Sequence, residues 1–256
     1  MTIRPGRLFR LSQLQETQRR LYDLETFDFP SVHTDVAEGQ QPAIVPIKTV
    51  LTEGKHRKVN FGVGYGSEEK ARVSADWRHV NFFRGARTLQ LEGQYSSINR
   101  GIRTNFRQPY VFGPRNQLVL RAQSWRTDEP AYVLSTNGGR VTFEHRFPRR
   151  GPLSQRTTDT TVAVSYTDEY QSYRVSEEAL RTPGFLKNLL ALGLDPLNGQ
   201  AKGWLASIAV NMHRSTADST VNAKSGYLVD AHFEQAGNQL GGDYEFTEAI
   251  FEGRYY

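Results

Sequence analysis

The sequence predicts a mostly β protein: a transmembrane antiparallel β-barrel of about ten strands, preceded by a small α/β unit. Three observations predict this fold. Residues 58–256 form a series of segments in which apolar and polar side chains alternate, as in strands with two different faces. Charged residues occur in the middle of several of these segments. Only 38% of the residues are hydrophobic, which a wet barrel interior explains better than a dry globular core.

The composition argues against several other classes of protein. There is no cysteine, so neither a disulfide framework nor a thiolate site is available, and the six histidines lack the spacing of metal ligands. We therefore expect no metal site and no cofactor. The net charge of +5 comes from arginines spread singly through the alternating segments, so nucleic-acid binding is not expected. Neither a nucleophile motif nor a dinucleotide fingerprint is present, which argues against an enzyme.

Membrane crossing by helices is not expected, because no segment reaches the roughly 18–20 apolar residues that a transmembrane helix needs. The N-terminus also lacks the apolar core of a signal peptide. A soluble sheet with one wet face would show the same alternation, so a soluble sandwich or barrel is the alternative. Charges deep inside long segments and aromatic residues near segment ends favour the membrane barrel. These aromatic residues are Trp77, Phe82, Phe83, Tyr95, Tyr110, Phe112, Trp125, Tyr132 and Phe147.

The α/β unit comes first in the chain. Leucines at positions 11, 14, 21 and 24, with Gln18, mark one face of a helix, and Ser12 lies near its start. Residues 27–39 and 43–54 then read as two short strands.

Ten strands follow in the barrel region. They are expected at Val59–Tyr65, Ala71–Arg78, Leu89–Tyr95, Gly101–Tyr110, Gln117–Gln123, Arg140–Phe147, Thr160–Asp168, Trp204–His213, Tyr227–Gln235 and Glu245–Tyr256. If the strands run up and down, the turns at 81–87, 110–116 and 148–156 lie at one end. Those at 66–70, 97–101, 127–132 and 170–201 lie at the other. In the last of these, Ser176 is expected to cap a short helix that begins at Glu177 and covers the loop or binds a partner.

Eight charged residues have the parity of the polar face and are predicted to point into the lumen. We expect them to form charged ladders across strands or to line a conduction path. They are Asp76, Arg78, Glu92, Arg103, Arg107, Arg121, Glu144 and Arg146.

Three stretches of the sequence carry a family resemblance. "LFRLSQLQETQRRLYDLETFDFPSVHTDV" resembles the end of a POTRA domain, and the chain from Val59 to Pro114 is similar to the start of the barrel in the BamA/TamA outer-membrane assembly superfamily. Residues 222–246 resemble the middle of that barrel. The carrying residues are the first-strand Gly62, Gly64, Tyr65 and Gly66, the turn residues Asn81, Phe82 and Gly85, and the motif Arg107, Gln108, Pro109 and Tyr110.

The resemblance implies two units. Residues 1–55 correspond to a partial POTRA domain with its second helix and last two strands, and residues 56–256 to the N-terminal part of an outer-membrane barrel. The family's barrel has sixteen strands, so ten strands correspond to a fragment of it. A complete smaller barrel is the alternative.

The implied function is assembly and insertion of β-barrel proteins in the bacterial outer membrane, with the POTRA part in the periplasm. The first strand is expected to act as a lateral gate formed by Val59, Asn60, Phe61, Gly62, Val63, Gly64, Tyr65 and Gly66. Its glycines either permit bending or make room for a neighbouring aromatic ring. Implied partners are unfolded outer-membrane protein clients, outer-membrane lipid, and periplasmic or lipoprotein assembly partners. The alternatives are polypeptide secretion through the same type of barrel, as in two-partner systems, and a passive pore.

Overall fold

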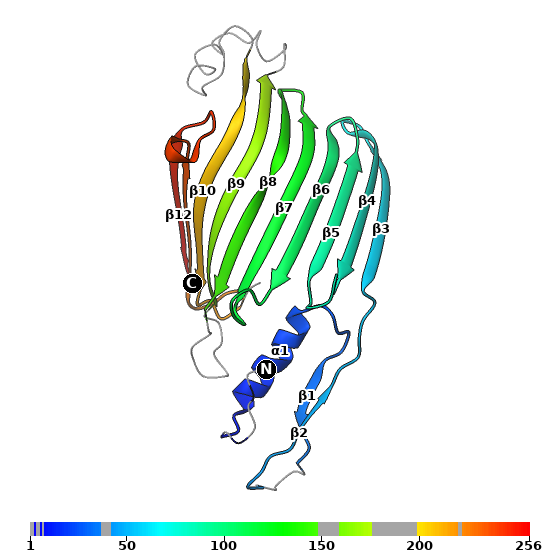
Figure 1. Ribbon diagram of the computed structural model, residues 1–256, viewed down its shortest axis with the longest axis vertical. Coiled ribbons are helices and arrows are strands. Elements are labelled where there is room, and N and C mark those ends of the chain that lie inside the picture. The colour runs from blue at the N-terminus through cyan, green and yellow to red at the C-terminus, as the bar shows by residue number, and fades with distance from the viewer. Residues whose placement is uncertain are drawn as a thin grey trace.

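One antiparallel sheet of ten strands dominates the fold (Figure 1). The computed structural model describes residues 3, 6, 8–36, 42–147, 159–175, 199–219 and 222–256. The strands of the sheet are β3 (Arg57–Gly66), β4 (Lys70–Val80), β5 (Thr88–Tyr95), β6 (Asn99–Pro109), β7 (Asn116–Asp128), β8 (Tyr132–Arg146), β9 (Asp159–Val175), β10 (Gln200–Ser215), β11 (Tyr227–Ala236) and β12 (Phe246–Tyr255). All ten predicted strands are confirmed, and β7 to β10 are longer than expected.

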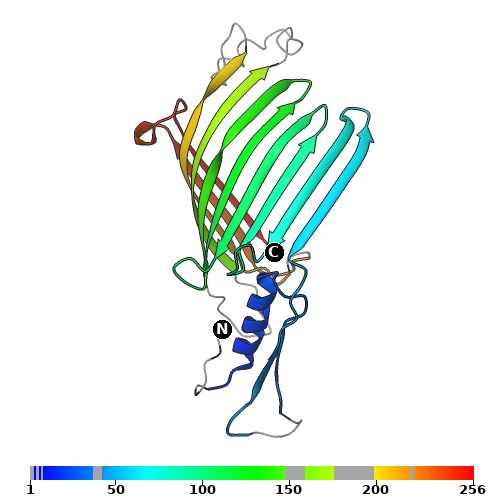
Figure 2. The same ribbon diagram turned by 45° about the vertical axis from the view of Figure 1, so that its right-hand side comes forward.

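Each strand pairs with its neighbours in the sequence, so the sheet is a simple up-and-down meander from β3 to β12. It curls along its width, as Figure 2 shows. The two edge strands, β3 and β12, stand at opposite ends of the strand order and are not hydrogen-bonded to each other. The sheet therefore has two free edges.

The two faces of the sheet differ sharply in chemistry and in exposure. The apolar face carries alternate side chains such as Phe61 and Val63, which are 80% and 86% exposed. The polar face carries hydroxyl, amide and charged groups, and its central residues Thr167 and Ser207 are 1% and 0% exposed. Crowded polar side chains opposite an open apolar surface are typical of a barrel wall in lipid and not of a soluble sandwich.

Two of the aromatic residues noted near segment ends lie on the polar face. Trp125 has the same strand parity as Arg121 and Gln123 and is only 9% exposed. Tyr132 stacks on Tyr173 with 5.5 Å between ring centroids. Both residues are near strand ends, as expected, but their parity within the strand turns them away from the apolar face.

A helix and a hairpin precede the sheet and lie beyond one end of it (Figure 1). They are α1 (Leu11–Asp23), β1 (Ser31–Thr34) and β2 (Ile47–Val50), and β1 pairs with β2. Leu14 and Val32 form their small buried core. Arg10 occupies the N-cap position without a capping side chain, so Ser12 lies inside the helix. None of the helices in the described ranges has the length and hydropathy needed to cross a bilayer.

The described turns fall at the ends of the sheet that the strand order requires. Turns 81–87 and 110–115 lie on the side of the N-terminal unit, and turns 67–69, 96–98 and 129–131 lie on the opposite side (Figure 1). The predicted turn at 148–156 and the predicted helix at Ser176 fall outside the described residues.

The segment between β11 and β12, which includes η1 (Asn238–Leu240), covers the part of β10 that extends beyond β11. The backbone N–H of Asp243 donates to the carbonyl of Trp204 at 2.7 Å, and the Asp243 carboxylate accepts from the Trp204 N–H at 2.7 Å. The N–H of Gly237 donates to Ala206 at 3.1 Å. These contacts pair backbone groups of Trp204 and Ala206 that β11 does not reach.

The close approach of β8 and β9 can be tested at Gly138 on β8. It has a φ of +150°, and a Cβ at this position would overlap the carbonyl oxygen of Asp168 on β9. We expect Gly138→Ala to destabilise the chain by about 1–3 kcal/mol through backbone strain and overlap. Urea unfolding in lipid vesicles, followed by tryptophan fluorescence, measures this. The control is Gly93→Ala, because a Cβ there meets no atom within 4 Å. Equal midpoints for both variants would contradict the prediction.

Candidate functional site

Strand β3, which has one free edge, is the predicted gate strand. Val59, Phe61, Val63 and Tyr65 project from its apolar face and are all more than half exposed. The other edge of β3 is fully paired with β4, from Arg57 opposite His79 to Gly66 opposite Lys70. The strand is thus held on one side, and on its other side a row of backbone donors and acceptors is open for pairing.

The glycines of β3 face polar side chains of β4. An added Cβ at Gly62 would lie 2.6 Å from Ser74 Oγ, and one at Gly64 would lie 3.4 Å from an Arg72 guanidinium nitrogen. At Gly66 the nearest atom is the Cβ of Glu69, at 3.9 Å. The atoms nearest to these positions are therefore not aromatic, which favours the bending alternative over that of an aromatic neighbour. Because these glycines have no side chains, the polar face of β3 has little packing, which favours bending of the strand.

A hydrogen-bond network joins the polar faces of β3, β4 and β5. Asp76 accepts from Asn60 Nδ2 at 3.2 Å through one carboxylate oxygen. Its other oxygen accepts from Gln90 Nε2 at 2.7 Å. Asp76 therefore anchors β3 to the rest of the sheet through side chains as well as backbone.

The strand register places all eight predicted charged residues on the polar face. They do not form the expected ladder. Glu92 lies opposite Arg103, but the Arg103 guanidinium stacks on the Trp125 ring at 3.6 Å. Glu144 and Arg146 pair along one strand at 3.7 Å. The partners are therefore set by side-chain reach and not only by cross-strand position.

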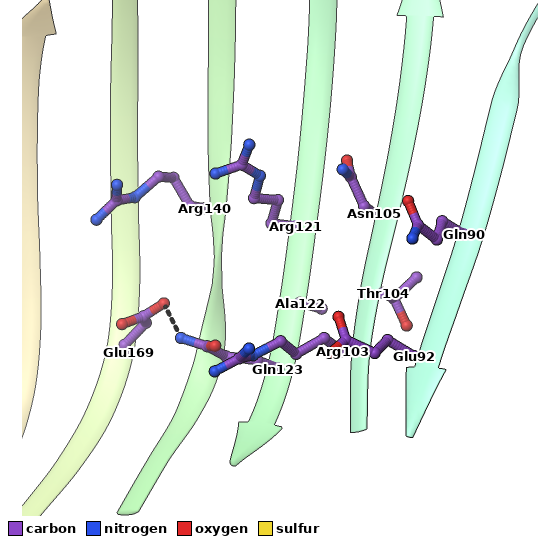
Figure 3. A pocket seen from close by; sticks show the side chains of 10 residues that line it. All are labelled: Gln90, Glu92, Arg103, Thr104, Asn105, Arg121, Ala122, Gln123, Arg140 and Glu169. Atoms are coloured by element: carbon purple, nitrogen blue, oxygen red, sulfur yellow. Dashed lines mark hydrogen bonds between the residues drawn. The ribbon is translucent and has the colours of Figure 1, made fainter. Parts of the chain in front are cut away.

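An open pocket of about 410 Å³ lies on the polar face over β5 to β9 (Figure 3). In the view of Figure 3, Gln90, Asn105, Arg121 and Arg140 form an upper row. Glu92, Arg103, Gln123 and Glu169 form a lower row, in which Gln123 donates to Glu169 at 3.1 Å. Arg140 and Glu169 are missing from the predicted site. Glu169 was missed because the predicted β9 ended at Asp168. Arg140 was left out of the predicted set although its parity within the strand was correct.

The N-terminal unit is joined to the sheet by a carboxylate that the sequence analysis also missed. Glu25, just after α1, forms ion pairs with Arg78 on β4 and with Arg107 on β6. The second pair is 3.3 Å long. Between this unit and the ends of β6 to β8 lies a second pocket of about 410 Å³, lined by Arg19, Arg20, Arg115 and Glu144 among others.

The motif Arg107–Tyr110 ends β6 beside this junction. Arg107 binds Glu25, and Gln108 accepts a hydrogen bond from Arg87 Nε at 2.5 Å, which ties the turn 81–87 to β6. Pro109 is the last residue of the strand. Tyr110 has a positive φ of 63°, and its N–H donates to Asn116 across the turn. The motif therefore fixes the turns next to the N-terminal unit.

One cluster of possible metal ligands occurs among the described residues. The ligand atoms of His232, Glu234 and Glu248 all lie within 4.8 Å of one another on the polar face of β11 and β12. The scattered histidines did not suggest it, because Glu248 reaches the site through strand pairing. His232 already contacts Asn211 at 2.7 Å and Glu234 at 3.3 Å. Both ring nitrogens of His232 are thus engaged by protein groups.

Comparisons with known proteins bear on the sheet. A family model described as the Omp85 superfamily domain matches residues 81–256. No curated protein matches the chain. Among solved structures, the fold is similar to the crystal structure of BamA from Haemophilus ducreyi lacking POTRA domains 1–3, with a TM-score of 0.56 and 16% sequence identity. The likeness covers 93% of this chain and 44% of that BamA chain, so this chain spans less than half of its length.

Glu25 offers a test of the junction. We expect Glu25→Gln to loosen the N-terminal unit while leaving the unfolding midpoint nearly unchanged, because each exposed ion pair contributes at most about 1 kcal/mol. The chain lacks cysteine. Spin labels on Lys48→Cys and Ala122→Cys therefore report the distance between hairpin and sheet, and its distribution should broaden.

The matched control is Glu16→Gln, which removes the same charge but breaks ion pairs to Arg19 and Arg20 within α1. It should leave the distance distribution unchanged. An unchanged distribution in Glu25→Gln would show that the junction does not depend on this carboxylate.

Proposed function

The chain belongs to the Omp85 superfamily, and on this premise we propose that it takes part in inserting β-barrel proteins into the bacterial outer membrane through the free edge of β3. Residues 56–256 would form the N-terminal part of a sixteen-stranded transmembrane barrel. Residues 1–55 would form part of a POTRA domain in the periplasm. The unpaired edge of β3 is the single observation that carries the proposal.

The energetics of strand insertion explain why such an edge is useful. A backbone N–H or C=O group without a partner costs several kcal/mol in the hydrocarbon core of a bilayer. A client strand that pairs with β3 as it enters the membrane satisfies one row of these groups at once. The exposed apolar side chains of β3 would meet lipid during this step.

The sheet also separates lipid from a polar interior. In the proposed barrel the apolar face contacts outer-membrane lipid, and the polar face lines the lumen. The N-terminal unit lies at the end where β3 begins, so a client held by its hairpin would be near the gate (Figure 2). Unfolded outer-membrane proteins are the proposed clients, with periplasmic or lipoprotein assembly partners at the N-terminal unit.

Photocrosslinking tests the gate. With p-benzoylphenylalanine at Phe61 on the edge strand, the chain in lipid vesicles should crosslink to a urea-unfolded outer-membrane barrel protein added from solution. The same probe at Phe143, on the apolar face of the central strand β8, is the control and should crosslink much less. Equal crosslinking at both positions would contradict entry at β3. A client that ends inside the vesicles, and not in the bilayer, would indicate polypeptide secretion.

Disulfide crosslinking separates an open seam from a passive ten-stranded pore. Ala231 and Phe251 are directly opposite on β11 and β12, so cysteines at these positions should crosslink. Cysteines at Phe61 and Phe251, on the two edge strands, should not crosslink in the same vesicles. Efficient crosslinking of the second pair would mean that β3 and β12 close the barrel by themselves, and it would overturn the proposed gate.

A further inference from the structure

Arginines are the dominant cations on the polar face of the sheet. Eight arginines within the strands have the parity of this face. They are Arg72, Arg78, Arg103, Arg107, Arg121, Arg140, Arg146 and Arg254. A guanidinium on a packed polar face normally has an anion or an aromatic ring beside it.

Six of the eight follow this rule. Five form ion pairs: Arg72 with Glu69, Arg78 and Arg107 with Glu25, Arg146 with Glu144, and Arg254 with Glu252. Arg103 stacks on Trp125. The remaining two, Arg121 and Arg140, form no ion pair with any described residue.

These two arginines are also direct cross-strand neighbours on β7 and β8. Like charges in this position repel each other. Arg140 Nε donates to Thr167 Oγ1 at 2.9 Å, which leaves its terminal nitrogens available, and Arg121 has no hydrogen-bond partner among the described residues. Both line the pocket of Figure 3, whose carboxylates Glu92 and Glu169 lie in the lower row.

The same pocket contains an unpaired acceptor. Asn105 Oδ1 is buried and accepts no hydrogen bond from the described residues, and Asn105 lies directly opposite Arg121 on β6. Buried acceptors normally have a donor. The upper row of the pocket thus presents two guanidinium groups for an anion and one carbonyl oxygen for an N–H group.

We propose that Arg121 and Arg140 bind the carboxylate of an acidic peptide segment that lies along the polar face, with an N–H group of that segment donating to Asn105. An aspartate or glutamate residue combines a carboxylate with a nearby backbone N–H, as this pocket requires. A phospholipid headgroup is disfavoured because lipid would contact the opposite face. The inference does not depend on whether the chain inserts or secretes its clients.

The first experiment measures binding of a short fluorescein-labelled peptide rich in glutamate to the chain folded in zwitterionic lipid vesicles, by fluorescence anisotropy. Loss of a charge-assisted, forked contact should weaken binding by about tenfold in Arg121→Gln and in Arg140→Gln. The control is Arg254→Gln, which removes the same charge from the same face. Arg254 pairs with Glu252 and lies outside the pocket. The peptide affinity of this variant should stay within about twofold of the wild type because the effect of a distant charge is screened by salt. The glutamine version of the peptide should bind weakly to all variants.

Three outcomes would overturn the proposal: equal binding to the wild type and the double variant, equal binding of the glutamine peptide, or complete competition by inorganic phosphate at peptide-like concentrations, which would indicate a small-anion site. A second measurement guards against misfolding. Arg121→Gln removes the repulsion from Arg140 and breaks no hydrogen bond or ion pair with a described residue, so it should shift the urea midpoint upward. A lowered midpoint would assign Arg121 a structural role instead.

Discussion

The backbone hydrogen-bond ladder from β3 to β12 is the interaction on which the rest of the structure depends. Strands β4 to β11 are paired on both sides, and the segment 237–245 pairs with Trp204 and Ala206 of β10, which β11 does not reach. In lipid, such pairing is obligatory because unpaired backbone groups cost several kcal/mol each. Among the described strands, β3 and β12 are the two with a whole side unpaired, so a function that adds a complete strand must use one of them.

Alternation along each strand follows from the pleat, and for this reason much of the fold could be predicted from the sequence. Side chains two residues apart share a face, so the segment from Val59 to Tyr65 alone indicates which residues lie on the apolar face and which lie on the polar face. All ten strands were found in this way. Trp125 and Tyr132 show the limit of the argument, because nearness to a strand end does not determine which face an aromatic residue occupies. Gly101, opposite Trp125, leaves room for the indole on the polar face.

The candidate site was harder to predict because parity within a strand does not give the contacts between strands. The eight predicted charges share a face, but the partner of Arg78 and Arg107 is Glu25, which lies 53 residues before Arg78. The meeting of Arg121 with Arg140 depends on the register between β7 and β8. Register is set by turns such as 129–131, whose geometry the alternation of hydrophobicity does not encode.

The length of β3 has a consequence for the proteins that the proposed gate would template. β3 contains ten residues, and a tilted strand that crosses a bilayer needs about 9–11. Only every second residue of a strand directs its backbone groups toward a given neighbour, so β3 can engage about half of the residues of an incoming strand. The backbone groups of the other half are paired only when the client's own next strand forms beside it. A template of this size therefore favours clients that enter as hairpins, because the second strand of a hairpin supplies the missing half of the ladder.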